Sequence, residues 1–214
     1  MKLPEPPLLL VTDRTQARLP LEDVVAAACA GGCRWVSLRE KDLAADAQVA
    51  LARILRPIAQ RFGARLTLHG DPALARTAGL DGVHLPANGD AAAARAMLGP
   101  EALIGISIHS AAEAAALRAT SVDYAIAGPA FLTASKPGYG PALGTDGLAA
   151  TCRAAPVPVV AIGGIEAPDV AEVIAAGAAG VAVMGSVMRA ADPRKVVEDL
   201  LAAAAAFGPM RRAL

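Results

Sequence analysis

The chain repeats one pattern eight times, a short apolar run followed by an alanine-rich amphipathic segment, and this repeat constrains the fold more than any other feature. Each run is nearly continuous in apolar character, which is typical of a β-strand that is covered on both faces. The predicted strands are Leu8–Asp13, Arg34–Arg39, Arg65–Gly70, Asp81–Leu85, Ala102–Ser107, Asp123–Gly128, Val157–Gly164 and Gly180–Ser186.

The alanine-rich segments between these runs are predicted to be helices, because Ala and Leu are strong helix formers. A glycine follows several of them directly, as in Ala78-Gly79 and Ala176-Gly177, and glycine ends helices because it accepts the left-handed conformation. The predicted helices are Leu21–Ala30, Ala44–Phe62, Pro72–Ala78, Asp90–Leu98, Ala111–Ala119, Thr145–Ala154, Pro168–Ala176 and Pro193–Ala206.

Eight strand–helix units in 214 residues predict a (β/α)8 TIM barrel at the small end of its size range. The alternative is an open doubly wound sheet, but no G-x-G-x-x-G motif follows the first predicted strand. No linker or shift in composition marks a boundary, so residues 1–214 are predicted to form a single TIM-barrel domain.

Composition excludes several classes of function. Lys+Arg and Asp+Glu both total 20, so the chain lacks the basic excess of a general nucleic-acid binder. No apolar run reaches the roughly 18 residues of a membrane span, and the N-terminus does not resemble a signal peptide. Cys29, Cys33 and Cys152 lack zinc spacing and are expected to be free thiols in a reducing compartment. We therefore expect a cytoplasmic protein that binds neither nucleic acid nor membrane.

Polar side chains collect at the ends of the predicted strands, which is where barrels of this kind carry their chemistry. Arg39 and Lys41 follow the second strand and could bind an anion. His69 ends the third strand, and Ser107 and His109 lie at the end of the fifth.

Three histidines at neighbouring strand ends, His69, His84 and His109, also raise the possibility of a metal site. Their spacing matches no short metal-binding motif, and His84 lies inside the fourth strand. We therefore interpret His84 as a structural histidine rather than as a ligand.

The last two strands end in glycine-containing turns. Gly163 and Gly164 end the seventh strand, and Met184, Gly185 and Ser186 end the eighth. Glycines let backbone N–H groups approach a ligand closely, and the loops after strands seven and eight are the usual phosphate site of this fold. The sequence therefore predicts a phosphate site here.

A long irregular loop, Ala127–Gly144, reads AGPAFLTASKPGYGPALG and follows the sixth strand. Long loops inside compact domains are usually functional. Thr133, Ser135 and Lys136 supply two hydroxyls and a cation, so the loop is predicted to contact a phosphorylated small molecule at the barrel mouth.

Six motifs in this order, LREK, DGVHL, IGISIHS, GPAFLTASK, VVAIGGI and GVAVMGS, resemble the thiamin phosphate synthase family, which includes the related thiazole tautomerases. The resemblance covers roughly Leu8 to Ala206. It implies a (β/α)8 barrel that joins hydroxymethylpyrimidine diphosphate to a thiazole phosphate, releases pyrophosphate and uses Mg²⁺.

The resemblance also implies roles for individual residues. Arg39 and Lys41 would hold the pyrimidine diphosphate, and cations fixed beside a leaving pyrophosphate lower the barrier because negative charge develops there. The residues expected to bind substrate are Thr133, Ser135, Lys136, Gly163, Gly164, Met184, Gly185 and Ser186. Those expected to act in catalysis are Arg39, Lys41, His69, Ser107, His109 and Lys136.

The chain departs from the family's pattern at Ser37, where synthases usually have Gln, and at two metal-binding positions. The family has Asn-Asp after the third strand, where this chain has His69-Gly70, and Gly-Gln-x-Asp after the fourth, where this chain reads Pro86–Gly89. Both family aspartates are metal ligands. Because Mg²⁺ prefers hard oxygen ligands, Asp71 and Asp90 are the candidate replacements.

Three functions stay open at this point. The first is synthesis of thiamin phosphate, which LREK and GPAFLTASK favour. The second is tautomerisation of a thiazole phosphate, because the HGD and HLP segments resemble the tautomerase branch and His69 or His109 could be its acid or base. The third is non-catalytic binding of a phosphorylated ligand on a degenerate barrel. All three predict small phosphorylated ligands, and the family implies a possible homodimer.

Overall fold

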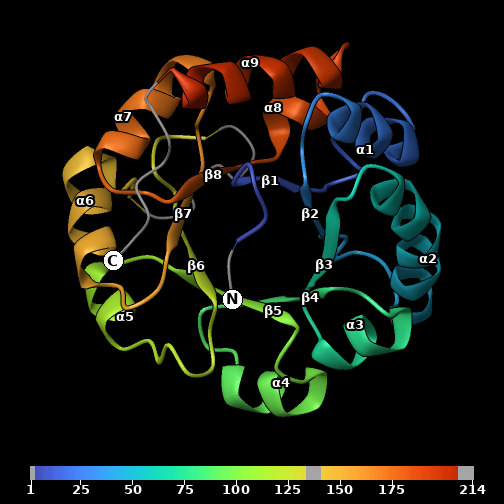
Figure 1. Ribbon diagram of the computed structural model, residues 1–214, viewed down its shortest axis with the longest axis horizontal. Helices are drawn as coiled ribbons and strands as arrows, with labels where there is room; N and C mark the ends of the chain where they lie inside the picture. The colour runs from blue at the N-terminus through green and yellow to red at the C-terminus, as the bar shows by residue number, and fades with distance from the viewer. Residues whose placement is uncertain (1–2, 134–140, 207–214) are drawn as a thin grey trace.

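The computed structural model describes residues 3–133 and 141–206 and confirms the predicted (β/α)8 barrel. Parallel strands close in chain order, and β8 pairs with β1 to complete the ring (Figure 1). The strands are β1 (Leu8–Val11), β2 (Trp35–Leu38), β3 (Arg65–His69), β4 (Gly82–Leu85), β5 (Leu103–Ile108), β6 (Tyr124–Ala127), β7 (Val159–Ile162) and β8 (Gly180–Val183).

Helices surround the barrel and cover the outer face of the sheet (Figure 1). They are α1 (Leu21–Ala30), α2 (Ala45–Arg61), α3 (Pro72–Ala78), α4 (Ala91–Leu98), α5 (Ala111–Ala115), α6 (Gly144–Ala154), the 3-10 helix η1 (Ala167–Asp169), α7 (Val170–Ala175), α8 (Gly185–Met188) and α9 (Pro193–Ala205).

Two predicted boundaries are wrong by three residues or more. The helix predicted to end at Ala119 ends at Ala115, and the N–H groups of Ser121 and Val122 instead donate to Arg118 O in a turn. Serine and threonine side chains compete for backbone hydrogen bonds and favour turns over helix interiors.

The strand predicted to reach Ser186 stops at Val183. Met184 leaves the extended conformation with φ −134° and ψ −79°, and the short helix α8 begins at Gly185. A short helix therefore follows β8 directly. The sequence did not indicate it, because the apolar run continues from the strand into the helix.

The interior of the barrel is filled by alternate side chains of the strands, as the two-residue period of a strand requires. Trp35 and Tyr124 meet edge to face with their ring centroids 4.6 Å apart. A Cβ at Gly105 would lie 2.0 Å from the Tyr124 ring, so only glycine leaves room for this tyrosine. The aromatic pair fills the barrel interior below the mouth. The polar side chains of the strand ends lie above it, at the mouth.

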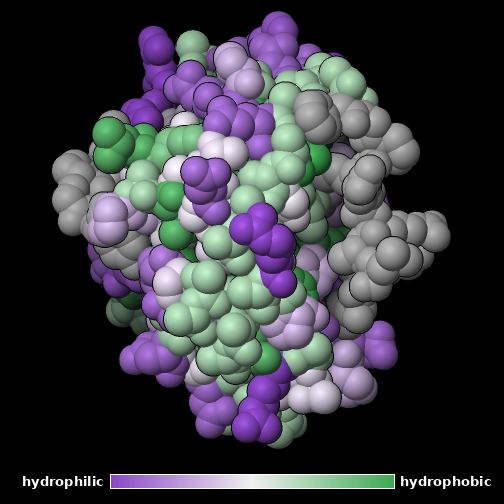
Figure 2. All heavy atoms as spheres, turned by 90° about the vertical axis from the view of Figure 1, so that its left-hand side faces the viewer, coloured by the Kyte–Doolittle hydropathy of each residue, from purple (hydrophilic) through white to green (hydrophobic). Residues whose placement is uncertain are grey.

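A second and larger apolar layer lies between the sheet and the helices. Cys29 and Cys33 are fully buried in it and Cys152 packs at its edge, and all three are free thiols. Figure 2 shows the outer surface over α6 and α7, where weakly hydrophobic residues lie between hydrophilic ones. Within the described part of the chain, no helix has both the length and the apolar character that crossing a membrane requires.

Candidate active site

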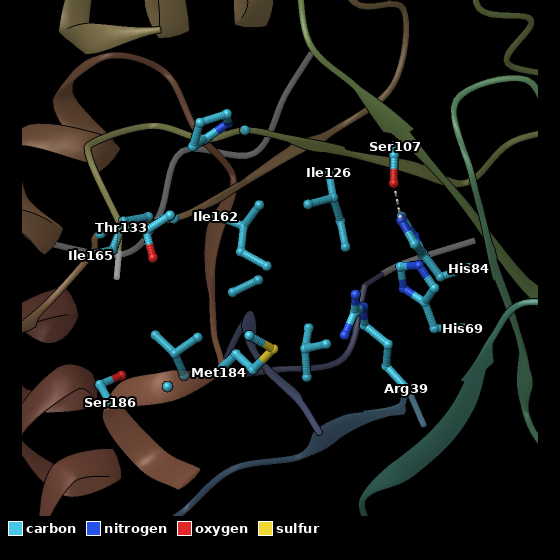
Figure 3. A pocket seen from close by; sticks show the side chains of 18 of the residues that line it. Arg39, His69, His84, Ser107, Ile126, Thr133, Ile162, Ile165, Met184 and Ser186 are labelled. Atoms are coloured by element: carbon cyan, nitrogen blue, oxygen red, sulfur yellow. Dashed lines mark hydrogen bonds between the residues drawn. The ribbon is translucent and has the colours of Figure 1, made fainter. Parts of the chain in front are cut away.

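A cavity of about 270 Å³ opens at the carboxyl ends of the strands. Val11 at the end of β1, Ile126 on β6, Ile162 on β7 and Met184 after β8 give it an apolar floor. Polar groups from different strand ends stand around this floor (Figure 3). The placement agrees with the expectation that this barrel carries its chemistry where strands end.

One side of the cavity is polar and comes from β2 to β5. We call Arg39, His69, His84 and Ser107 the histidine wall (Figure 3). His84 Nε2 lies 2.9 Å from Ser107 Oγ, and the rings of His69 and His84 are 4.8 Å apart. The strand pairing brings these groups together, because His69 and His84 are direct neighbours across β3 and β4.

The histidine wall holds a neutral imidazole. Burial, together with the positive charge of Lys41, lowers the pKa of His84 to about 3. His84 therefore hydrogen-bonds without carrying charge near neutral pH. It is buried and hydrogen-bonded, as a structural histidine would be, but it also lines the cavity, which the sequence interpretation missed.

Arg39 owes its backbone position to a buried carboxylate. The Arg39 N–H donates to Thr12 Oγ1 at 2.9 Å, and the Thr12 hydroxyl donates to Glu40 Oε1 at 2.7 Å. The Arg14 N–H also donates to both Glu40 oxygens, at 3.1 and 3.0 Å. Glu40 thus fastens the loop after β1 to the loop after β2.

Lys41 stands outside the cavity lining. Its side chain is exposed at the surface. The loss of some hydration around its ammonium group, together with the neighbouring charge of Arg39, lowers the pKa of Lys41. Its charge still reaches His84. His109 does line the cavity, and its ring Nδ1 lies 3.3 Å from Glu113 Oε2 on α5.

The other side of the cavity is built from the turns after β7 and β8. We call Gly163, Gly164, Gly185 and Ser186 the glycine wall. Gly163 and Gly164 have φ of 102° and 65°, conformations that residues with a Cβ rarely adopt. These are residues at which the sequence predicts a phosphate site, and that role stays a prediction.

The loop after β6 is fastened to the glycine wall. Phe131 N–H donates to Gly163 O at 3.0 Å, and a Cβ at Gly164 would lie only 2.3 Å from Leu132 O. This contact brings Thr133 to the cavity lining. Ser135 and Lys136, the other predicted groups of this loop, lie outside the described residues.

Asp71 and Asp90 serve as helix caps. Asp71 Oδ1 accepts from the Ala73 N–H at 2.8 Å at the start of α3, and Asp90 Oδ1 accepts from the Ala93 N–H at 2.9 Å at the start of α4. Neither residue is among the described residues that line the cavity.

The described residues do not fit Mg²⁺. The cavity lining carries one carboxylate, Glu166, beside imidazole and guanidinium groups, whereas Mg²⁺ prefers oxygen ligands. Within residues 3–133 and 141–206, no group of three or more His, Cys, Asp or Glu side chains could hold a metal. The metal role of Asp71 and Asp90 stays a prediction.

Sequence reasoning also missed Glu166 and Arg189, which line the cavity beside the glycine wall. Both lie within a few residues of the glycine turns that were identified. That proximity is the signal that could have found them.

The chain resembles known proteins over most of its length. The family model described as thiamine monophosphate synthase matches residues 8–187. A putative thiamine-phosphate synthase of Geobacter sulfurreducens is 47% identical over 197 residues, which cover 91% of this chain and 92% of that protein. A thiamine-phosphate synthase of Xanthobacter autotrophicus is 40% identical, with 92% of this chain and 94% of that protein covered.

A solved structure gives the same picture. Thiamine phosphate pyrophosphorylase from Pyrococcus furiosus superposes with a TM-score of 0.84 at 28% identity. The superposition covers 95% of this chain and 97% of that one.

Proposed function

Because the chain belongs to the thiamine monophosphate synthase family, we propose that its cavity joins hydroxymethylpyrimidine diphosphate to thiazole phosphate and releases pyrophosphate. The observation that carries this proposal is the division of one cavity into two polar walls. The histidine wall and the glycine wall face each other across an apolar floor (Figure 3). Two ring substrates that each carry phosphate need such a division.

The pyrimidine diphosphate binds at the histidine wall. The Arg39 guanidinium can hold two diphosphate oxygens through two parallel hydrogen bonds. The buried Glu40 keeps the Arg39 backbone in place through Thr12. When the bond to the diphosphate breaks, the electron pair leaves with pyrophosphate, and a cation that is already in position stabilises the growing negative charge.

The neutral His84 suits the same step. As the diphosphate departs, the pyrimidine carbon becomes electron-poor, and a charged imidazole beside it would oppose that change. Burial keeps His84 uncharged, while its Nε2 retains a hydrogen-bond partner in Ser107. His84 therefore offers a polar contact without adding a further positive charge beside that carbon.

The thiazole phosphate binds at the glycine wall. Gly163 and Gly164 line that end of the cavity without side chains, and Gly185 and Ser186 line the same end. The apolar floor of Ile126, Ile162 and Met184 supports the thiazole ring between the two walls. A thiazole bound in this way turns its ring nitrogen toward the pyrimidine carbon that the nitrogen attacks.

Family members use Mg²⁺, and when the ion is bound it neutralises charge on the leaving pyrophosphate. The described donors do not form a protein site for it, so no step above depends on one. We also propose that the chain acts in the cytoplasm, because its three free thiols suit a reducing compartment. A homodimer stays a prediction, and light scattering would measure it.

Turnover with purified substrates tests the function. The chain is incubated with hydroxymethylpyrimidine diphosphate, thiazole phosphate and Mg²⁺, and thiamin phosphate is quantified by liquid chromatography. We expect product only when both substrates are present. Proton exchange on the thiazole ring without any thiamin phosphate would instead identify a tautomerase.

A further inference from the structure

Arg189 is a cationic side chain beside the glycine wall. It follows α8 directly, and its N–H donates to Gly185 O at 3.0 Å, so it lies one turn after Gly185 and Ser186. Arg189 lines the cavity, and together with Ser186 it also lines an open groove that adjoins it. It therefore stands where the proposed phosphate site meets solvent.

The loop after β1 holds Arg189 by both its backbone and its side chain. Arg18 N–H donates to Met188 O at 2.9 Å, which fixes the end of α8. The Arg189 guanidinium donates from Nη1 to Gln16 Oε1. The Gln16 amide in turn donates to Asp13 Oδ2 at 2.6 Å.

Asp13 is a firm anchor for this chain of hydrogen bonds. Burial would raise its pKa, but hydrogen bonds from Thr15 and Gln16 and the charge of Arg39 outweigh burial and lower it. The carboxylate is therefore ionised at neutral pH, and it accepts from Gln16 with one oxygen while Thr15 donates to the other. An anchored Gln16 gives the Arg189 guanidinium a set direction.

Charge distribution favours a phosphate as the partner. Among the described residues that line the cavity, the guanidinium groups belong to Arg39 and Arg189. They lie on different walls, one after β2 and the other after β8. Each of two phosphorylated substrates would then meet one guanidinium, which carries a full charge and can bind two phosphate oxygens at once.

We propose that Arg189 binds the phosphate of the thiazole substrate and that Gln16 is the positioning residue that aims its guanidinium. The proposal rests on the proposed function and adds a charged partner to the glycine wall. Glu166 lines the same end of the cavity with the opposite charge. Its carboxylate weakens the attraction for phosphate and limits how tightly the product is held.

Steady-state kinetics with matched variants test this assignment. Thiazole phosphate is varied at saturating pyrimidine diphosphate for the parent, Arg189→Ala, Gln16→Ala and Glu166→Gln. The matched control is Arg194→Ala, because Arg194 is an exposed arginine on α9 that pairs with Glu198. Calorimetric titrations of the parent and Arg189→Ala use thiazole phosphate and the unphosphorylated thiazole alcohol as probes.

We expect Arg189→Ala to raise the KM for thiazole phosphate about 10- to 100-fold, the usual effect of losing a hydrogen bond to a charged group. The KM for pyrimidine diphosphate should stay unchanged. Gln16→Ala should raise the KM for thiazole phosphate about 3- to 10-fold with kcat retained, and its effect should vanish in the Arg189→Ala background. Glu166→Gln should lower that KM about 2- to 5-fold.

The thiazole alcohol separates a phosphate contact from general damage. Arg189→Ala should bind the alcohol as the parent does, because the alcohol has no phosphate to lose. A parent that turns over while Arg189→Ala keeps its affinity for thiazole phosphate would overturn the Arg189 assignment and leave the proposed function intact. Equal losses for phosphate and alcohol would overturn it too, because they indicate a structural role.

Discussion

His84 Nε2 lies 2.9 Å from Ser107 Oγ, across the neighbouring strands β4 and β5. The pair stands at the base of the histidine wall, where burial keeps the imidazole uncharged. A buried histidine with a lowered pKa affects stability as well as chemistry, because the unfolded chain binds a proton that the folded chain rejects.

Acid should therefore destabilise the barrel through His84. Its pKa is about 3 in the fold and about 6.5 when unfolded, so its full stabilisation is present above pH 6.5 and is lost as the pH falls toward 3. Between pH 7 and pH 5 this linkage removes about 2 kcal/mol. Urea unfolding at the two pH values should show a smaller decline for His84→Gln than for the parent. An equal decline would show that His84 is protonated in the fold.

The buried carboxylate of Glu40 should contribute more to stability than the exposed carboxylate of Asp42, which also binds Arg14. Glu40→Gln leaves donors at Thr12 and Arg14 with a poorer acceptor, which should cost about 1–3 kcal/mol of stability. It should also raise the KM for pyrimidine diphosphate, because Arg39 depends on Thr12. Asp42→Asn is the control, since Asp42 pairs with Arg14 at the surface, where solvent screens the pair and it contributes little to stability. Equal changes in stability and in KM for the two variants would show that Glu40 does not hold the Arg39 backbone in place.

Gly164 should tolerate no side chain. Gly164→Ala drives a Cβ to 2.3 Å from Leu132 O, so the loop that carries Thr133 must move and thiazole phosphate binding should fall at least tenfold. Gly63 has nearly the same φ, 64°, with nothing within 4 Å of an added Cβ. Gly63→Ala should therefore cost about 1 kcal/mol of stability without changing binding. Calorimetry with thiazole phosphate compares the two, and normal binding by Gly164→Ala would place the phosphate elsewhere.

Asp71 and Asp90 should act on stability rather than on Mg²⁺. Asparagine caps helices as well as aspartate does, so Asp71→Asn and Asp90→Asn should keep the parent's stability, whereas the alanine variants should each lose about 1 kcal/mol. The Mg²⁺ concentration for half-maximal turnover should not change in the asparagine variants. A clear increase would identify the carboxylates as metal ligands, as the sequence predicted.

The architecture of this chain could be read from its sequence because the signals are local. Each strand and helix shows its own period, and the ends of consecutive strands in a barrel must meet. The amino-acid pattern alone therefore suffices to assign His69, Ser107 and Gly164 to one cavity. The glycines of the turns after β7 and β8 likewise predicted that these turns line the cavity.

The contacts that the sequence concealed join distant parts of the chain. Glu40 is one of several charged residues in LREK, and its partners in the buried site are Thr12 and Arg14, 28 and 26 residues away. Arg189 depends on Gln16, 173 residues away. No local sequence pattern indicates contacts between residues so far apart. Residues that position others, such as Glu40 and Gln16, were therefore not identified from the sequence.

The most direct measurement is ³¹P NMR of a reaction that contains both substrates and Mg²⁺. We expect thiamin phosphate and pyrophosphate to appear together in equal amounts as the two substrates disappear. Arg39→Ala should slow both signals alike, because one guanidinium serves the departure of pyrophosphate and so the joining step. Binding of both substrates by the parent with no pyrophosphate formed, or pyrophosphate released without thiamin phosphate, would contradict the account.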